Sequence, residues 1–137
     1  MISITGFFVI KGRKLMNKFP KLDKSSFEFY ENKASGYSTQ SFKTKMGGAN
    51  NVLQIRVTNN QLWLKTNFFM AIIADKFDLL HIIPINKIHK VSIIENQLNL
   101  EFVKNSENKK IVLRSKKQKE LLDLLNKKMN TKNGNEV

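Results

Sequence analysis

Two histidines, His81 and His89, are the residues of this sequence best suited to act as a general base or a metal ligand. Asp75, Asp78 and His81 recur at steps of three, a spacing that would place them on one face of a helix. We instead predict a strand around His81, where residues three apart point to opposite sides. His89 stands beside Lys90 at the start of another predicted strand. These residues therefore predict neither a metal site nor a catalytic site.

Other kinds of reactive site are also missing from the sequence. It contains no cysteine, which excludes disulfides, thiolate-rich zinc sites and a cysteine nucleophile. Its 11 acidic residues are scattered, and no serine lies in a nucleophile elbow. Gly47-Gly48 is not followed by the helix that a phosphate-binding loop requires, so we interpret it as a hairpin turn. We expect a protein that is not an enzyme and that needs no cofactor.

Positive charge is concentrated at the two ends of this 137-residue chain, whose net charge is +13. Residues 1–24 contain six basic and one acidic residue, and residues 104–132 contain ten basic and three acidic residues. The stretch between them is nearly balanced. Such clusters attract anionic partners, either lipid head groups or nucleic acid. Because the basic C-terminal segment has no aromatic residues between its charges, we rank nucleic acid below a lipid surface.

The N-terminal segment combines apolar and basic residues. Residues 1–10 are uncharged and strongly apolar, and Lys11, Arg13 and Lys14 follow at once. A spanning helix needs roughly 20 apolar residues, about twice this length. One interpretation is a terminal helix or strand packed on the domain, or a frayed end. The other is a membrane-proximal remnant, because an apolar stretch followed by basic residues is typical of a transmembrane segment entering the cytoplasm.

Residues 27–129 are predicted to form one antiparallel β domain after an N-terminal segment and linker at 1–26. Leu53, Ile55 and Val57 alternate with polar residues, and Asn59-Asn60 is suited to a two-residue hairpin turn. Further strands are expected over residues 35–45 at a sheet edge, 62–64, 77–83, 88–94, 98–103 and 111–113. The spacing of so many short strands indicates a sandwich or barrel.

The C-terminal part of the domain changes from a strand period to a helical one. Ser115 and Gln118 match a capping box, and leucines then recur at steps of three and four residues. We predict a helix that ends near Met129, followed by a disordered tail over 130–137. The predicted core consists of Leu53, Ile55, Val57, Leu62, Leu64, Leu98, Leu100, Phe102, Leu121 and Leu125.

This order of elements resembles the pleckstrin-homology-like fold. Residues 51–128 resemble the GRAM and bacterial pleckstrin-homology-like families, through the segments VLQIRVTNNQLWLKT, IIPINKIHKVSI, NQLNLEFV and KKIVLRSKKQKELLDLLNKK. The resemblance implies a mainly β protein, with a bent seven-stranded antiparallel barrel capped by an amphipathic C-terminal helix. The sequence departs from the eukaryotic pattern because its single tryptophan, Trp63, lies on a strand and not in that helix.

The resemblance also implies a candidate lipid site. Lys45 and Arg56 are spaced like the first two basic residues of the phosphoinositide motif of pleckstrin-homology domains, and Lys43 adds charge nearby. Thr58 stands where that motif has a further basic residue. The alternative is a solvated hairpin. Lys11, Arg13 and Lys14 are further candidates for contact with anions.

An apolar run over residues 68–74 is the last candidate contact. If Phe68, Phe69 and Met70 are exposed, they form a patch for a membrane or a protein. If the run folds back, it is a buried strand extension or a short helix. We expect a non-enzymatic binding or scaffold module at the cytoplasmic face of a membrane, in weak contact with anionic lipid. The alternative is a protein- or nucleic-acid-interaction domain without a lipid role.

Overall fold

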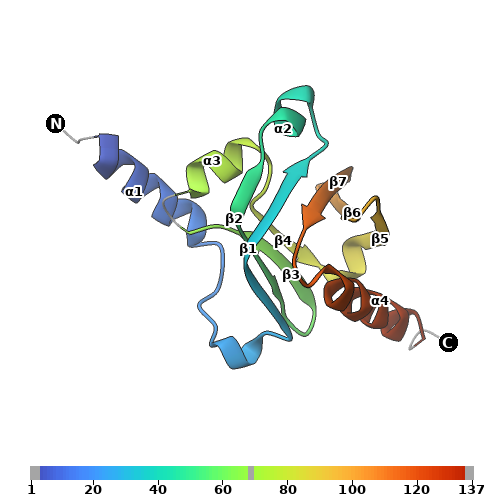
Figure 1. Ribbon diagram of the computed structural model, residues 1–137. Coiled ribbons are helices and arrows are strands. Elements are labelled where there is room, and N and C mark those ends of the chain that lie inside the picture. The colour runs from blue at the N-terminus through green and yellow to red at the C-terminus, as the bar shows by residue number, and fades with distance from the viewer. Residues whose placement is uncertain (1–3, 68–69, 135–137) are drawn as a thin grey trace.

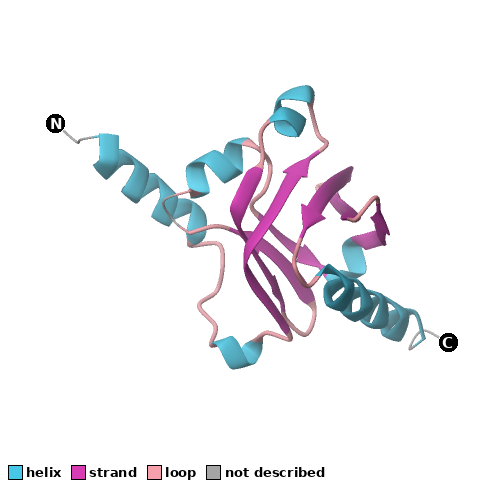
Figure 2. Ribbon diagram, viewed as in Figure 1, coloured by secondary structure: helices cyan, strands magenta, loops and turns pink. Residues whose placement is uncertain are grey.

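The computed structural model describes residues 4–67 and 70–134, and this part of the chain is mainly β. Its strands are β1 (Phe29–Ser38), β2 (Ala49–Val57), β3 (Gln61–Lys65), β4 (His81–Pro84), β5 (Ile88–Ile94), β6 (Gln97–Lys104) and β7 (Glu107–Arg114). Its helices are α1 (Ile4–Met16), α2 (Phe42–Met46), α3 (Ala71–Lys76) and α4 (Gln118–Gly134), with short 3-10 turns η1 (Lys24–Ser26) and η2 (Ile85–Lys87). Figure 2 shows the strands at the centre and the helices around them.

The strands form one antiparallel sheet in the order β4-β3-β2-β1-β7-β6-β5. The sheet is not closed, so the expectation of a barrel is wrong. Its two edges, β4 and β5, are consecutive in the chain, but β4 has only four residues and ends at Pro84, which has no N–H to donate. The turn η2 then separates the two strands. Helix α4 packs on η2, β5 and β6 and thereby covers this open side (Figure 1).

Asparagine-containing turns join the strands where the sequence predicted them. Asn59 and Asn60 connect β2 to β3. Glu95 and Asn96 have φ angles of 52° and 63°, and this pair of left-handed residues matches the twist of the hairpin that joins β5 to β6. Most of the strands and turns predicted between residues 51 and 113 are thus confirmed.

The predicted core is also confirmed. All ten of the residues predicted to be buried are fully buried: Leu53, Ile55, Val57, Leu62, Leu64, Leu98, Leu100, Phe102, Leu121 and Leu125. Strand alternation and the leucine spacing of α4 were sufficient to identify them, because both patterns repeat with the period of the element.

The region predicted as an edge strand over residues 35–45 is different. Strand β1 ends at Ser38 and lies in the middle of the sheet, between β2 and β7, and residues 42–46 form α2. A Cβ atom on Gly36 would lie 2.9 Å from the Val112 carbonyl oxygen, so glycine allows β7 to approach closely here. The segment is therefore central in the sheet as far as Ser38, and its later polar residues belong to the connection between β1 and β2.

The strand predicted to begin at Phe77 begins only at His81. Helix α3 comes first, and Asp78 ends it with a φ of 60°. The N–H of Leu79 donates to the carbonyl oxygen of Ala74 (2.9 Å), and the N–H of Asp78 donates to that of Asp75 (3.1 Å). This is the Schellman arrangement, in which glycine is usual. Because aspartate occupies that position, no glycine marks the helix end in the sequence.

Helix α4 extends to Gly134, beyond the predicted end near Met129. At its start, the Ser115 N–H and the Gln118 side-chain oxygen are 3.5 Å apart, while the Ser115 hydroxyl accepts from the Lys117 N–H at 3.0 Å. The carboxylate of Glu31, from β1, accepts hydrogen bonds from the Ser115 hydroxyl and the Lys116 N–H. The carboxylate of Glu31 thus lies at the N-terminal end of α4, where the helix dipole favours negative charge. The basic residues around it are disfavoured there by the same dipole.

Candidate functional site

A row of three large side chains crosses the outer face of the sheet. Strand register places Tyr30 of β1 opposite Arg56 of β2, and Arg56 opposite Trp63 of β3. Because side chains alternate along a strand, this row faces away from core residues such as Ile55 and Leu64. Trp63 is nevertheless only 1% exposed, so other parts of the chain must cover this face.

The segment between α1 and β1 provides that cover. Phe19 and Phe27 both pack edge-on against Trp63, with ring centroids 5.9 Å and 5.3 Å away. Edge-to-face pairs of this kind are a preferred aromatic arrangement. The residues predicted to be a linker are therefore packed on the sheet.

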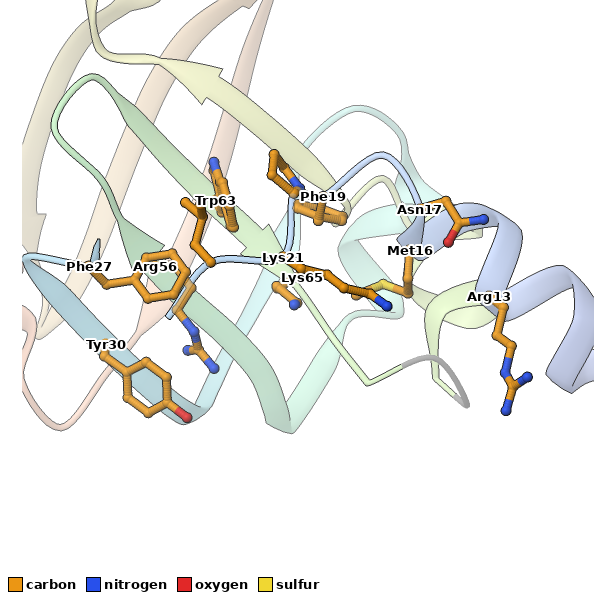
Figure 3. A pocket seen from close by; sticks show the side chains of 12 residues that line it. Arg13, Met16, Asn17, Phe19, Lys21, Phe27, Tyr30, Arg56, Trp63 and Lys65 are labelled. Atoms are coloured by element: carbon orange, nitrogen blue, oxygen red, sulfur yellow. The ribbon is translucent and has the colours of Figure 1, made fainter. Parts of the chain in front are cut away.

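A groove of about 830 Å³ remains between this segment and the sheet (Figure 3). We call it the aromatic groove, and it is lined by Arg13, Met16, Asn17, Phe19, Pro20, Lys21, Leu22, Phe27, Tyr30, Arg56, Trp63 and Lys65. Its volume is within the range of small-molecule sites. The lining contains four cationic side chains and no carboxylate.

Arg56 is fixed in the wall of the aromatic groove and is only 6% exposed. Its guanidinium donates to the carbonyl oxygens of Glu31 (2.9 Å) and Ile55 (3.1 Å) and to the side-chain oxygens of Asn32 (2.5 Å) and Gln54 (3.2 Å). Its Cζ lies 3.6 Å from the centroid of the Tyr30 ring. Burial lowers the pKa of Arg56, but a guanidinium stays charged in proteins. Arg56 therefore acts as a fixed positive charge whose terminal nitrogens are already engaged.

Lys65, at the end of β3, is the other half-buried cation of the aromatic groove. Its Nζ lies 5.6 Å from the centroid of the Phe19 ring. Burial lowers the pKa of Lys65 first, and the charge of Arg56 lowers it further. Within residues 4–67 and 70–134, no carboxylate pairs with the Lys65 ammonium and no acceptor receives a hydrogen bond from it. The Lys65 ammonium is thus partly buried, and no carboxylate of the described residues lies beside it.

The structure separates the two residues that matched the phosphoinositide motif. Lys45, like Lys43, lies on α2 before β2 begins, and Lys45 is exposed. Arg56 is the eighth residue of β2, about 23 Å from its start at roughly 3.3 Å per residue. Lys45 and Arg56 therefore lie on different elements, and Arg56 is near the far end of its strand.

The other candidate contacts lie near the aromatic groove or in α3. Lys11, Arg13 and Lys14 are exposed on the last turns of α1, and Arg13 also lines the groove. Phe68 and Phe69 lie outside the described residues. Met70 is half-buried, and α3 follows it as a short helix in which Ala71, Ile72 and Ala74 are buried.

A second cluster of polar groups surrounds Asp78. Its carboxylate accepts hydrogen bonds from the Ser38 hydroxyl (2.8 Å) and the Lys109 ammonium (2.8 Å), and lies 3.2 Å from Nε2 of His81. The ammonium of Lys104 lies 3.0 Å from Nδ1 of His81. Because a lysine ammonium can only donate, Nδ1 is the acceptor and the ring proton is on Nε2.

The contact between Asp78 and His81 corrects the expectation that these residues lie apart. His81 begins β4, and the left-handed Asp78 turns its carboxylate back toward the ring. Burial lowers the pKa of His81, and its 1% exposure leaves no access for a substrate. Burial alone raises the pKa of Asp78, but its hydrogen bonds from His81, Lys109 and Ser38 outweigh burial and lower it.

This cluster balances buried charge and shows no catalytic geometry. The Ser38 hydroxyl donates to Asp78 and not to the imidazole, so it is not activated as a nucleophile. Among residues 4–67 and 70–134, no group of three or more histidines and acids is placed to hold a metal ion. In the same part of the chain, no helix is long and apolar enough to cross a membrane.

Sequence reasoning missed most of the aromatic groove. Phe19, Phe27 and Tyr30 were assigned to a linker or to the start of the domain, and Lys65 was not singled out. A usable signal was the density of aromatic residues between positions 19 and 30, which is high for a linker. No protein-family model matches this chain, and no curated protein is significantly similar to it.

Proposed function

We propose that this protein is a non-enzymatic binding module of the pleckstrin-homology-like class that associates with an anionic membrane surface, on the cytoplasmic side. Its class is supported by the bent antiparallel sheet, the C-terminal helix over the open side, and the sequence segments between residues 51 and 128.

The observation that carries the proposed membrane contact is the form of α1. This helix extends away from the sheet with its N-terminal end outermost (Figure 1). Its sequence is apolar from Ile4 to Ile10, and the exposed Lys11, Arg13 and Lys14 follow. An apolar tip with a basic collar suits the membrane interface, where apolar residues enter the acyl boundary and cations meet the head groups.

The two basic ends lie apart in the molecule. Helices α1 and α4 lie on opposite sides of the molecule (Figure 1). The sequence of α4 lacks an uncharged apolar stretch at either end. We therefore assign the membrane contact to α1 and treat the charges of α4 as solvated.

The test is cosedimentation with vesicles of phosphatidylcholine, with and without phosphatidylserine, at low and high salt. Each basic residue near an anionic surface contributes about 1 kcal/mol, so replacing Lys11, Arg13 and Lys14 with glutamine should weaken binding roughly 100-fold at low salt. The matched control replaces Lys116, Lys117 and Lys119, around the start of α4, with glutamine and should change binding by less than about threefold.

Two outcomes contradict the proposal. Equal losses in the α1 variant and the α4 control would mean that only net charge matters. Absence of binding to anionic vesicles, together with tight binding of duplex DNA, would instead favour the nucleic-acid alternative.

A further inference from the structure

The lining of the aromatic groove carries an excess of positive charge. Arg13, Lys21, Arg56 and Lys65 line it, and none of the lining residues is acidic. Partly enclosed walls of low polarizability strengthen the field of such charges, because water screens them less. The groove therefore favours a ligand with a negative charge.

Lys65 identifies where that charge would lie. Its ammonium is partly desolvated and is repelled by Arg56, and both effects lower its pKa. An anion beside it would offset both effects and would accept the hydrogen bonds that no described residue now receives. Arg56 already uses both terminal nitrogens, so it contributes charge, and Lys65 and Lys21 contribute donors.

Apart from Asn17, the rest of the lining is apolar or aromatic. Leu22 is 45% exposed, and Phe27 and Tyr30 are half-buried. Figure 3 shows the basic side chains among these rings and Met16 of α1. A bare inorganic anion would leave this apolar surface in water, whereas an attached hydrocarbon chain would cover it, and removing apolar surface from water favours binding.

We propose that the aromatic groove binds one anionic amphiphile: a phosphate-bearing head group at Lys65 and Lys21, with its acyl part against Leu22 and Phe27. This deepens the proposed function, since it names the head-group chemistry that a membrane would present. It differs from contact through α1, because the site lies between the N-terminal segment and β1–β3 and can take a single molecule.

The test uses dihexanoyl phosphatidic acid as a dissolved monomer, so that vesicle binding does not enter. Binding is followed by calorimetry and by the fluorescence of Trp63, the single tryptophan of the chain, which lines the groove. Inorganic phosphate and dihexanoyl phosphatidylcholine are the comparison ligands. We expect saturable binding of the phosphatidic acid, at least tenfold weaker binding of phosphate, and no binding of the neutral lipid.

Lys65→Gln should weaken binding of the phosphatidic acid at least tenfold, while the exposed Lys45→Gln should not change it. Melting curves of both variants exclude unfolding as the cause. Absence of saturable binding, equal affinity for phosphate, or unchanged binding by Lys65→Gln would each overturn the inference. If the wild-type protein binds monomeric dihexanoyl phosphatidic acid but does not bind anionic vesicles, only the proposed membrane contact of α1 is refuted.

Discussion

Replacing Arg56 should destabilise the folded protein, although the sequence marked this residue as a ligand contact. Arg56→Met keeps much of the apolar stem but removes all four hydrogen bonds and the stacking on Tyr30. Arg56→Lys keeps the charge, but one ammonium cannot reproduce the planar set of donors. The pair of variants therefore separates the effect of charge from the effect of geometry.

The size of the destabilisation depends on which of the four acceptors can form hydrogen bonds with water once the guanidinium is gone. Asn32 is exposed and Gln54 is half-buried, so their amides can rehydrate at little cost. The carbonyl groups of Glu31 and Ile55 lie within the sheet, and each loses a bond from a charged donor that contributes about 1.5–3 kcal/mol. The substitution also removes the free-energy cost of burying the charged guanidinium, and this offsets part of the loss. We expect Arg56→Met to lower the free energy of unfolding by about 2–4 kcal/mol and Arg56→Lys by at least about half as much.

The assay is urea unfolding, monitored by the fluorescence of Trp63 on β3, which pairs with Arg56 on β2. Lys45→Met is the matched control, since Lys45 is exposed and should change stability by no more than about 0.5 kcal/mol. If both Arg56 variants fall within that same margin, the buried hydrogen-bond network does not stabilise the fold, and the reasoning is wrong.

Two further predictions concern the core and the buried histidine. Leu125→Ala should lower the free energy of unfolding by about 2–5 kcal/mol, while the exposed Ile94→Ala should have little effect; equal effects in urea unfolding would contradict the packing of α4 on the sheet. Because burial lowers the pKa of His81, the folded protein keeps the ring neutral while the unfolded chain takes up a proton, so stability should fall as pH drops below about 6.5. In His81→Asn this part of the pH dependence should disappear, and an unchanged slope between wild type and variant would show that His81 does not carry it.

Residues with a regular pattern could be placed from the sequence. Leu53, Ile55 and Val57 repeat with the period of a strand, and Leu121 and Leu125 with that of a helix, so each pattern identifies its buried face without knowledge of the partner. The position of the Asn59-Asn60 turn was equally local, because turn residues between two alternating stretches mark the end of a strand. The open form of the sheet could not be predicted from local patterns, because it depends on the short β4, on Pro84 and on η2.

The candidate site shows the same division. The sequence by itself determined the mainly β class, the C-terminal helix, the buried core and the positive charge of both ends. It could not decide that Phe19 would pack on Trp63 or that Arg56 would be buried, because these contacts join segments far apart in the chain. Polarity predicted exposure for Arg56, and only the hydrogen bonds of its guanidinium to the sheet, together with the ring of Tyr30, offset the cost of burying its charge. Tertiary structure alone therefore brought Lys65, Arg56 and the aromatic residues into one groove.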